Sequence, residues 1–310
     1  HDIIDTFFEE VQNREIKLSE IEDREIKDII EKIISEKLNL PQNYIFISSA
    51  KFRNQTFKLK RLILKAMKYI ILSITESEFE VFGHEVEFGE GKKYPPIEIT
   101  LDDGKKVEII GKIDRIDIAK DEEGRYLRII DYKSSSKNID LNAVCKIEDI
   151  EPAAVLYFNL IEEKLDKRKT KEEIEEEIKR NFKMKGLLVA DVKLIKKMDK
   201  SLEVGSSDIV PAYVTKEGGI SEGKSSVASK EQFKALQKYI IKTIKNISKE
   251  ILSGKIDIKP YYKNKSTPCD FCEYKAICQF DKNKFCNEYK YIPNLNKDEV
   301  WEKIESEVKS

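Results

Sequence analysis

The chain has 310 residues, with 57 Lys and Arg against 58 Asp and Glu, and its net charge of −1 excludes a protein that attracts nucleic acid through overall charge. Hydrophobic residues make up 40% of the chain, enough for the core of one large domain or two small ones. Since we find neither an apolar run of membrane-spanning length nor a signal peptide, we expect a cytoplasmic protein without membrane contact. The chain starts with His rather than Met, which indicates a fragment or processed chain.

Three stretches before residue 75 have the apolar spacing of amphipathic helices: residues 1–11, residues 26–34 and residues 51–71. Residues 51–68 also carry seven Lys or Arg and no acid. Such a run can be a solvated helix face, but in a chain of balanced charge it favours a phosphate-binding surface. The candidate DNA contacts on it are Arg53, Lys58, Arg61 and Lys65.

Residues 78–88 alternate as a strand, and a short strand near Ile97 leads through a turn at Asp102–Gly104 into residues 111–133. That last stretch predicts a β-hairpin with its turn at Asp121–Gly124. We expect Ile116 to face Ile129 and Asp117 to face Arg128.

In this register Asp114 faces Asp131, with side chains about 4.5–5.5 Å apart, where like charges repel unless a cation lies between them. Lys133 lies on the same strand face as Asp131. The alternative is a surface hairpin with solvated charges, which the coincidence of all these residues disfavours. Glu85 and Glu87 can also approach a cation at this position, although both are weaker candidates as ligands.

Beyond the hairpin, Val155–Phe158 predicts a buried strand, residues 164–185 a highly charged helix and residues 199–226 a flexible loop rich in Ser and Gly. A long helix follows and ends at Gly254. Its expected inward residues are Phe233, Leu236, Ile240, Ile244, Ile247 and Ile251.

The segment from Lys242 to Lys265 is basic and includes Tyr261 and Tyr262, a combination that suits single-stranded DNA or, equally, a basic helix end with core tyrosines. Three thiols then follow at the spacing of a zinc or iron–sulfur site, Cys269, Cys272 and Cys278. Three ligands are too few for a closed site, so Cys286 or a residue outside the chain is the expected fourth.

The strand that starts Gly111-Lys-Ile-Asp114 and the strand that ends Ile-Ile-Asp131-Tyr-Lys133 resemble the signature of PD-(D/E)XK nucleases of the RecB type. Nearly the whole chain resembles the C-terminal nuclease domain of the AddB family, which belongs to the bacterial AddAB helicase–nucleases. The start, His1-Asp-Ile-Ile-Asp5-Thr-Phe-Phe, matches a family segment whose His binds metal. The resemblance implies a metal site of His1, Asp114, Asp131 and the Tyr132 carbonyl, with Asp114, Asp131 and Lys133 as catalytic residues.

The same resemblance implies an α/β fold with a restriction-endonuclease-like core, a mixed central β-sheet flanked by helices, and a Cys-rich C-terminal iron–sulfur staple. It implies one nuclease domain over 1–310, comprising N-terminal helices (1–75), a catalytic sheet (78–160), a helical and loop region (164–253) and a basic, Cys-rich segment (254–310). The implied cofactors are Mg²⁺ or Mn²⁺ and a 4Fe–4S cluster, which this fragment can have lost. The implied partners are single-stranded DNA and the helicase–nuclease protein AddA.

Two features depart from the family. The family's first cluster cysteine lies upstream of the His that matches His1. The Gln-bearing helix expected after Lys133 does not occur near Asn142, so it is either deleted or left out of this sequence. No Walker motif occurs, so we do not expect ATP hydrolysis by this chain. The expected function is a metal-dependent exonuclease domain that processes double-strand breaks for recombinational repair. The alternatives are a free-standing nuclease similar to Cas4 and a non-catalytic DNA-binding clamp.

Overall fold

The protein is described by a computed structural model that covers residues 1–133, 151–159, 170, 173, 182–284 and 287–309. The chain divides into two compact units. The first contains His1–Ile97 and Glu108–Lys230, and the second contains Glu98–Val107 and Glu231–Ser310. Each unit is described by itself below.

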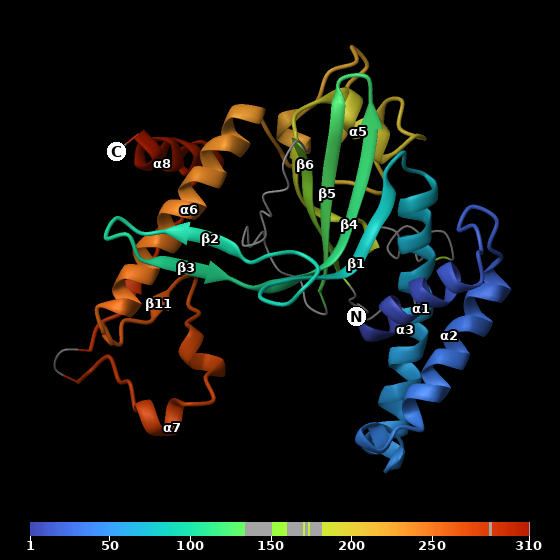
Figure 1. Cartoon of the computed structure of the whole chain (residues 1–310), viewed down its shortest axis with the longest axis horizontal. Coiled ribbons are helices and arrows are strands. Elements are labelled where there is room, and N and C mark those ends of the chain that lie inside the picture. Colours follow the sequence, from blue (N-terminus) through green and yellow to red (C-terminus); the bar gives the residue numbers. More distant parts are fainter. Residues whose placement is uncertain (134–150, 160–169, 171–172, 174–181, 285–286, 310) are drawn as a thin grey trace. The chain divides into compact units, whose positions relative to one another are not determined.

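A six-stranded mixed sheet forms the centre of the first unit, in the order β1-β4-β5-β6-β7-β10 (Figure 1). Neighbours are antiparallel except for the parallel pairs β5–β6 and β7–β10. The mixed sheet expected from the sequence is therefore confirmed. The strands are β1 (Glu80–Phe88), β4 (Gly111–Asp121), β5 (Gly124–Lys133), β6 (Glu151–Asn159), β7 (Lys185–Val189) and β10 (Val227–Ala228).

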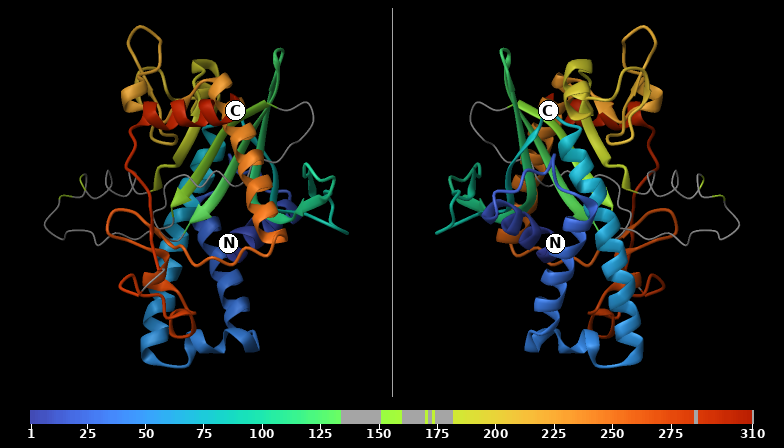
Figure 2. Two further views of the ribbon diagram at one scale, coloured as in Figure 1. Left: turned by 90° about the vertical axis from the view of Figure 1, so that its left-hand side faces the viewer. Right: turned by 90° about the vertical axis from the view of Figure 1, so that its right-hand side faces the viewer.

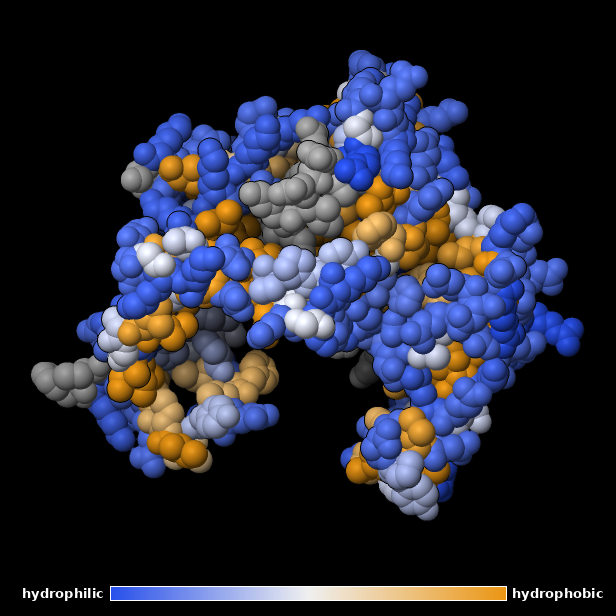
Figure 3. Space-filling model, in the orientation of Figure 1, coloured by the Kyte–Doolittle hydropathy of each residue, from blue (hydrophilic) through white to orange (hydrophobic). Residues whose placement is uncertain are grey.

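The helices predicted before residue 75 are confirmed as α1 (Asp2–Asn13), α2 (Asp23–Leu38) and α3 (Ala50–Thr75). Each buries one apolar face; on α1 it includes Phe7 and Phe8. Figures 1 and 2 show α2 and α3 side by side, joined at one end by the 3-10 helix η1 (Pro41–Ile47). Apolar side chains gather on the surface at this end in Figure 3. In η1, Ile45 and Phe46 are exposed.

The β4–β5 hairpin has the predicted turn and register. Asp121 pairs with Gly124 across the turn, and its carboxylate accepts hydrogen bonds from the N–H groups of Glu123 and Gly124. Ile116 faces Ile129 and Asp117 faces Arg128, as predicted. The paired ladder stops at Arg115–Ile130, one step before Asp114 and Asp131. Those two residues therefore lie where the strands cease to pair.

The Ser- and Gly-rich stretch 199–226 is not the flexible loop that its composition predicted. It follows α5 (Val192–Met198) and contains β8 (Gly205–Ser206), β9 (Tyr213–Val214) and the 3-10 turn η2 (Glu222–Lys224). Most of its apolar residues are buried, among them Leu202, Ile209 and Val210, and the buried Ser207 hydroxyl donates to Asp199 at 2.6 Å. Composition misleads because a few buried apolar residues and side-chain hydrogen bonds are enough to order a polar segment.

The second unit contains the long helix α6 (Lys230–Leu252), which starts at the boundary between the units. Phe233 and Leu236 are buried as expected, but Ile247 and Ile251 are 51% and 69% exposed, so the predicted inward face is wrong at its C-terminal end. The remaining elements are β2 (Ile97–Thr100), β3 (Lys106–Ile109), β11 (Tyr261–Tyr262), η3 (Pro268–Phe271), α7 (Lys275–Cys278), β12 (Lys290–Tyr291) and α8 (Lys297–Lys309).

Several sequence-based expectations lie outside the described residues. These are the segment near Asn142, most of the charged helix over 164–185, and Cys286. In the parts of the chain that the structure describes, no helix combines the length and the apolar character that crossing a membrane requires. The single domain expected over 1–310 stays a prediction.

Gly186 provides a test of the sheet. A Cβ at this position would lie 2.1 Å from the Val155 carbonyl oxygen and 2.8 Å from the Leu156 Cα, whereas a Cβ at Gly124 would meet nothing within 4 Å. The two glycines have nearly the same φ, +151° and +152°. We expect Gly186→Ala to lower the free energy of unfolding by about 1–3 kcal/mol more than Gly124→Ala, because only Gly186→Ala creates a clash. Urea denaturation of both variants measures the difference, and equal losses would contradict it.

Candidate metal-binding nuclease site

Three side chains from three elements meet at one end of the sheet. The imidazole of His1 and the carboxylates of Glu85 and Asp114 offer ligand atoms that all lie within 4.8 Å of one another. His1 directly precedes α1, Glu85 belongs to β1 and Asp114 to β4. One imidazole and two carboxylates form a donor set that suits Mn²⁺ or Mg²⁺. This trio, called the metal triad below, is the only such group among the residues that the structure describes.

Asp114 is fixed from two sides. Its Oδ2 accepts a hydrogen bond from the Tyr132 main-chain N–H at 2.7 Å and lies 3.4 Å from His1 Nδ1. Burial by itself raises the pKa of Asp114, but the hydrogen bonds from His1 and Tyr132 outweigh it and hold that pKa below its usual value. The hydrogen bond to Asp114 in turn raises the pKa of His1, and the Tyr132 main chain raises it further. The Tyr132 main chain therefore contacts both predicted ligands.

Glu85 reaches the triad through an irregularity in β1. Its φ is +49°, in the left-handed region that non-glycine residues rarely adopt. It lies between the ladder pairs His84–Arg115 and Val86–Ile113, which places it at the level of Asp114 on the neighbouring strand. The sequence made it only a weak candidate. The alternation of β1 was the one available signal, and it did not reveal how β1 and β4 align.

Asp131 and Lys133 form an ion pair of 2.5 Å near the triad, and each side chain is about one-third exposed, 33% and 29%. Burial raises the pKa of Asp131, and the negative charge of Asp114 raises it further against the opposing effect of Lys133. Asp131 is not part of the group whose atoms lie within 4.8 Å, so the structure gathers His1 and Asp114 but leaves Asp131 beside them.

A buried charged cluster lies within the hairpin itself. Arg115, Asp117 and Arg128 have no exposed side-chain surface. Asp117 lies 3.0 Å from Arg115 Nε and 2.7 Å from Arg128 Nη2, and Arg115 Nη1 donates to the Tyr132 hydroxyl at 3.2 Å. The Arg128 guanidinium also lies over the Phe79 ring, 4.9 Å from its centroid. Tyr132 thus links this cluster to Asp114.

An ion pair between Asp5 and His84, which the sequence did not reveal, attaches helix α1 to β1. Asp5 pairs with His84 Nδ1, and the His84 ring stacks on Phe8 with centroids 5.8 Å apart. His84 therefore connects β1 to α1. Since Asp5 is one helical turn after His1, this contact helps to place His1 beside Asp114.

The predicted DNA contacts lie in different units. Arg53, Lys58 and Arg61 are exposed on α3 and Lys65 is half-buried there, while Tyr261 and Tyr262 belong to the second unit. Tyr262 packs against Tyr289 and Tyr291, with centroids 5.2 and 5.6 Å away. Arg53 donates to the Ile47 carbonyl. The structure brings the four α3 residues onto one helix but says nothing of how they lie relative to the tyrosines.

The three cysteines of the described C-terminal segment are free thiols, with Cys269 half-buried and Cys272 and Cys278 exposed. Their sulfur atoms do not form a group within 4.8 Å of one another in the described residues. Their spacing suits a soft metal centre, but the positions of their sulfur atoms in this structure do not match one.

Comparison with known proteins assigns the class. Residues 1–279 match the family model of the PD-(D/E)XK nuclease superfamily. This match covers most of the chain and agrees with the mixed sheet and the acidic site at its end. The chain therefore belongs to the PD-(D/E)XK nuclease superfamily.

Curated relatives narrow the assignment to the AddB type that the sequence resembles. The chain is 39% identical to a protein of Clostridium novyi over 99% of this chain, 38% identical to one of Acetivibrio thermocellus over 97%, and 36% identical to one of Clostridioides difficile over 99%. Each is named as the B-type subunit of an ATP-dependent helicase/deoxyribonuclease. The chain spans 28–29% of the length of these relatives. The resemblance to AddB is confirmed.

Glu85→Gln tests the metal triad. Glu85 provides one of the three clustered ligand groups. Loss of a residue that only hydrogen-bonds to a metal ligand already weakens metal binding about tenfold, so we expect Glu85→Gln to weaken Mn²⁺ binding by at least that much. Isothermal titration with Mn²⁺ measures the affinity. Glu87→Gln is the matched control, because Glu87 is 49% exposed and pairs with Lys92 instead. Equal Mn²⁺ affinities of the two variants would show that Glu85 does not bind the metal.

Asp117→Asn tests the buried cluster. Without this carboxylate, two fully buried guanidinium groups lose their only anionic partner among the described residues. We expect a loss of about 3–5 kcal/mol in the free energy of unfolding, the usual cost of leaving a buried charge uncompensated. Urea denaturation gives the value. Glu123→Gln, which breaks the exposed pair with Lys193, should change it by less than about 1 kcal/mol. A small effect of Asp117→Asn would show that the arginines find other partners.

Proposed function

We propose that this chain is a metal-dependent deoxyribonuclease domain that hydrolyses phosphodiester bonds of single-stranded DNA. The observation that carries the proposal is the metal triad next to the Asp131–Lys133 pair, at the end of a PD-(D/E)XK hairpin. The names of the relatives, which describe helicase/deoxyribonucleases, point in the same direction. An exonuclease that follows a helicase would meet single strands.

His1, Glu85 and Asp114 would hold a divalent cation, Mg²⁺ or Mn²⁺, with Asp131 and the Tyr132 carbonyl completing the oxygen ligands. Such an ion acts as a Lewis acid on the scissile phosphate and promotes attack by water. Lys133 would contribute a fixed positive charge beside the reacting phosphate, where negative charge increases in the transition state. Asp131 would orient Lys133 through their 2.5 Å ion pair.

The α3 residues Arg53, Lys58, Arg61 and Lys65 would add electrostatic attraction for the DNA backbone. This attraction must be local, because the chain as a whole has a charge of −1. Tyr261 and Tyr262 would offer stacking surfaces in the second unit.

We further propose that the chain works in the cytoplasm as part of a helicase–nuclease with AddA, in the processing of double-strand breaks for recombinational repair. The support is that the relatives are named as one subunit of an enzyme, which implies at least one further subunit. An iron–sulfur cluster on Cys269, Cys272 and Cys278 belongs to the same proposal and would stabilise the C-terminal segment rather than take part in hydrolysis.

Degradation of end-labelled single-stranded DNA tests the activity. We expect cutting with Mg²⁺ or Mn²⁺, none with EDTA, and a loss of at least about a hundredfold in Asp131→Ala and Lys133→Ala. Lys133→Ala removes a positive charge at the reacting phosphate, and Asp131→Ala removes an oxygen ligand together with the partner that orients Lys133. Lys92→Ala is the control, because Lys92 pairs with Glu87, which is not part of the metal triad. If both active-site variants cut as fast as the wild type, the proposed site is wrong. Tight binding without cutting by the wild type would instead favour the DNA clamp.

A further inference from the structure

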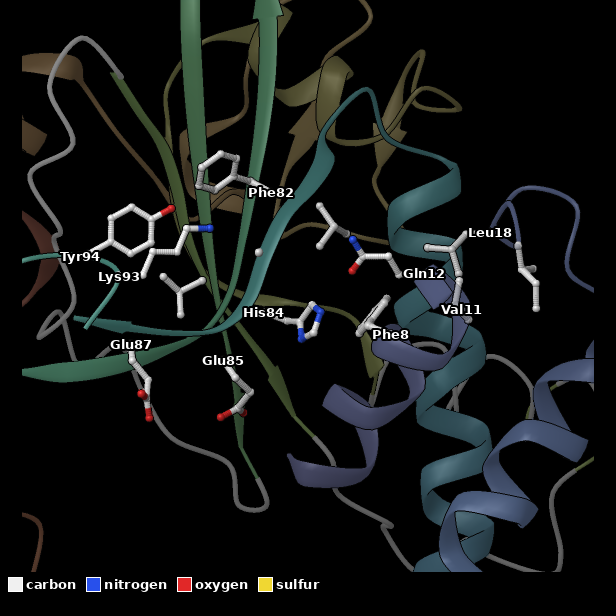
Figure 4. Close-up of a pocket in the computed structure, with 14 residues that line it drawn as sticks. Phe8, Val11, Gln12, Leu18, Phe82, His84, Glu85, Glu87, Lys93 and Tyr94 are labelled. Atoms are coloured by element: carbon white, nitrogen blue, oxygen red, sulfur yellow. The ribbon is translucent and has the colours of Figure 1, made fainter. Parts of the chain in front are cut away.

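A recess of about 740 Å³ lies between α1 and the edge strand β1 in the first unit. Figure 4 shows its lining: Phe82, Lys93 and Tyr94 lie toward one end, and Gln12 and other α1 side chains line the opposite wall. Glu85 belongs both to this recess and to the metal triad. The recess therefore reaches one residue of the proposed cutting site.

The wall of the recess presents aromatic rings to solvent. Phe82 is 52% exposed, although it lies in a strand whose other face packs on the core. Tyr94 is held beside the end of β1, because the Gly89 N–H donates to the Tyr94 carbonyl at 2.9 Å. An exposed ring and a fixed ring next to a metal site provide flat apolar surfaces on which a planar ligand can stack.

The recess also offers positive charge. Lys93 Nζ lies 5.6 Å from the centroid of the Tyr94 ring, and within the described part of the chain Lys93 forms no ion pair. The nearby acids are compensated: Glu87 pairs with Lys92 at 2.6 Å, and Glu85 pairs with Lys112. A phosphate can therefore approach Lys93 without strong repulsion from these carboxylates.

Aromatic rings, an available ammonium group and a side-chain amide are the groups that bind a nucleotide of a single strand, through stacking and phosphate contacts. A phosphodiester bond has a nucleoside on each side, and the metal triad shares a residue with each of two recesses. Glu85 lines the large one, and His1 lines a second of about 210 Å³ that also contains Phe46. Two neighbouring nucleosides would thus have separate places beside one metal site.

We propose that the recess between α1 and β1 binds one nucleoside of the DNA strand being cut, with its base on Phe82 and Tyr94 and a phosphate on Lys93. The proposal rests on the single-strand nuclease function above. A polypeptide strand pairing with the exposed edge of β1 is the competing occupant. The residue that the recess shares with the metal triad, Glu85, and the ammonium of Lys93 favour the nucleotide.

Equilibrium binding of short single-stranded oligodeoxythymidylates, measured by fluorescence anisotropy in EDTA, tests the recess without requiring cleavage. Phe82→Ala should raise Kd roughly 5- to 150-fold, the range expected for one base stacked on an aromatic ring. Phe82→Trp should restore binding, because it keeps a flat ring. Tyr44→Ala is the matched control, because Tyr44 is 66% exposed but lines neither recess.

Oligonucleotides with one abasic position give the sharper test. At the position that occupies the recess, removal of the base should raise Kd for the wild type and have no further effect on Phe82→Ala. Lys93→Ala should also weaken binding, whereas Lys92→Ala should not, since Lys92 already pairs with Glu87. If the effects of Phe82→Ala and of an abasic position on the free energy of binding simply add at every position, the proposal is overturned.

The outcomes separate this inference from the proposed function. A wild-type chain that binds but does not cut contradicts the nuclease, while the Kd values of the variants still decide the recess. A chain that cuts normally but whose Kd is unchanged in Phe82→Ala overturns the nucleoside site and favours a polypeptide strand on β1. A wild-type chain that does not bind single strands at all also overturns it.

Discussion

The site depends on one hydrogen bond, from the main-chain N–H of Tyr132 to the Asp114 carboxylate at 2.7 Å. The β4–β5 ladder stops at Arg115–Ile130, so without this bond the Asp114 side chain would have no fixed position relative to β5. With it, the two strands separate while Asp114 stays beside the Tyr132 main chain, which also contacts His1. The Asp114 ligand atoms thus lie where the ladder ends, in a position set by a main-chain hydrogen bond.

Tyr132 also couples the two faces of the sheet. Its N–H holds Asp114 on the metal side, and its hydroxyl accepts a hydrogen bond from Arg115 in the buried cluster. Asp117 in turn orients both Arg115 and Arg128. Buried ion pairs of this kind add little net stability, but they are costly to break, so they favour one arrangement over others. The cluster therefore restricts the position of Tyr132, and through it the position of Asp114.

The sequence predicted what depends on local pattern. The hairpin, its turn and its register follow from alternation and a short loop, and they placed Asp114 opposite Asp131. The structure ends the ladder one step before that pair. Glu85 was only a weak candidate, because its position depends on a left-handed residue and on how β1 aligns with β4, across 22 intervening residues. The Asp5–His84 pair joins residues 79 apart and has no local signal. Composition was misleading at 199–226, where buried side chains decide the structure.

The charges of the site explain why its two hairpin carboxylates differ. Asp114 receives two hydrogen bonds and keeps a lowered pKa, so it stays ionised, whereas burial and the charge of Asp114 raise the pKa of Asp131. Lys133 is the one cation in direct contact with Asp131 among the described residues, and it compensates only part of this repulsion. A divalent cation between the carboxylates would supply the missing positive charge and favour the ionised form of both. Loss of Lys133 would therefore act on Asp131 as well as on the phosphate.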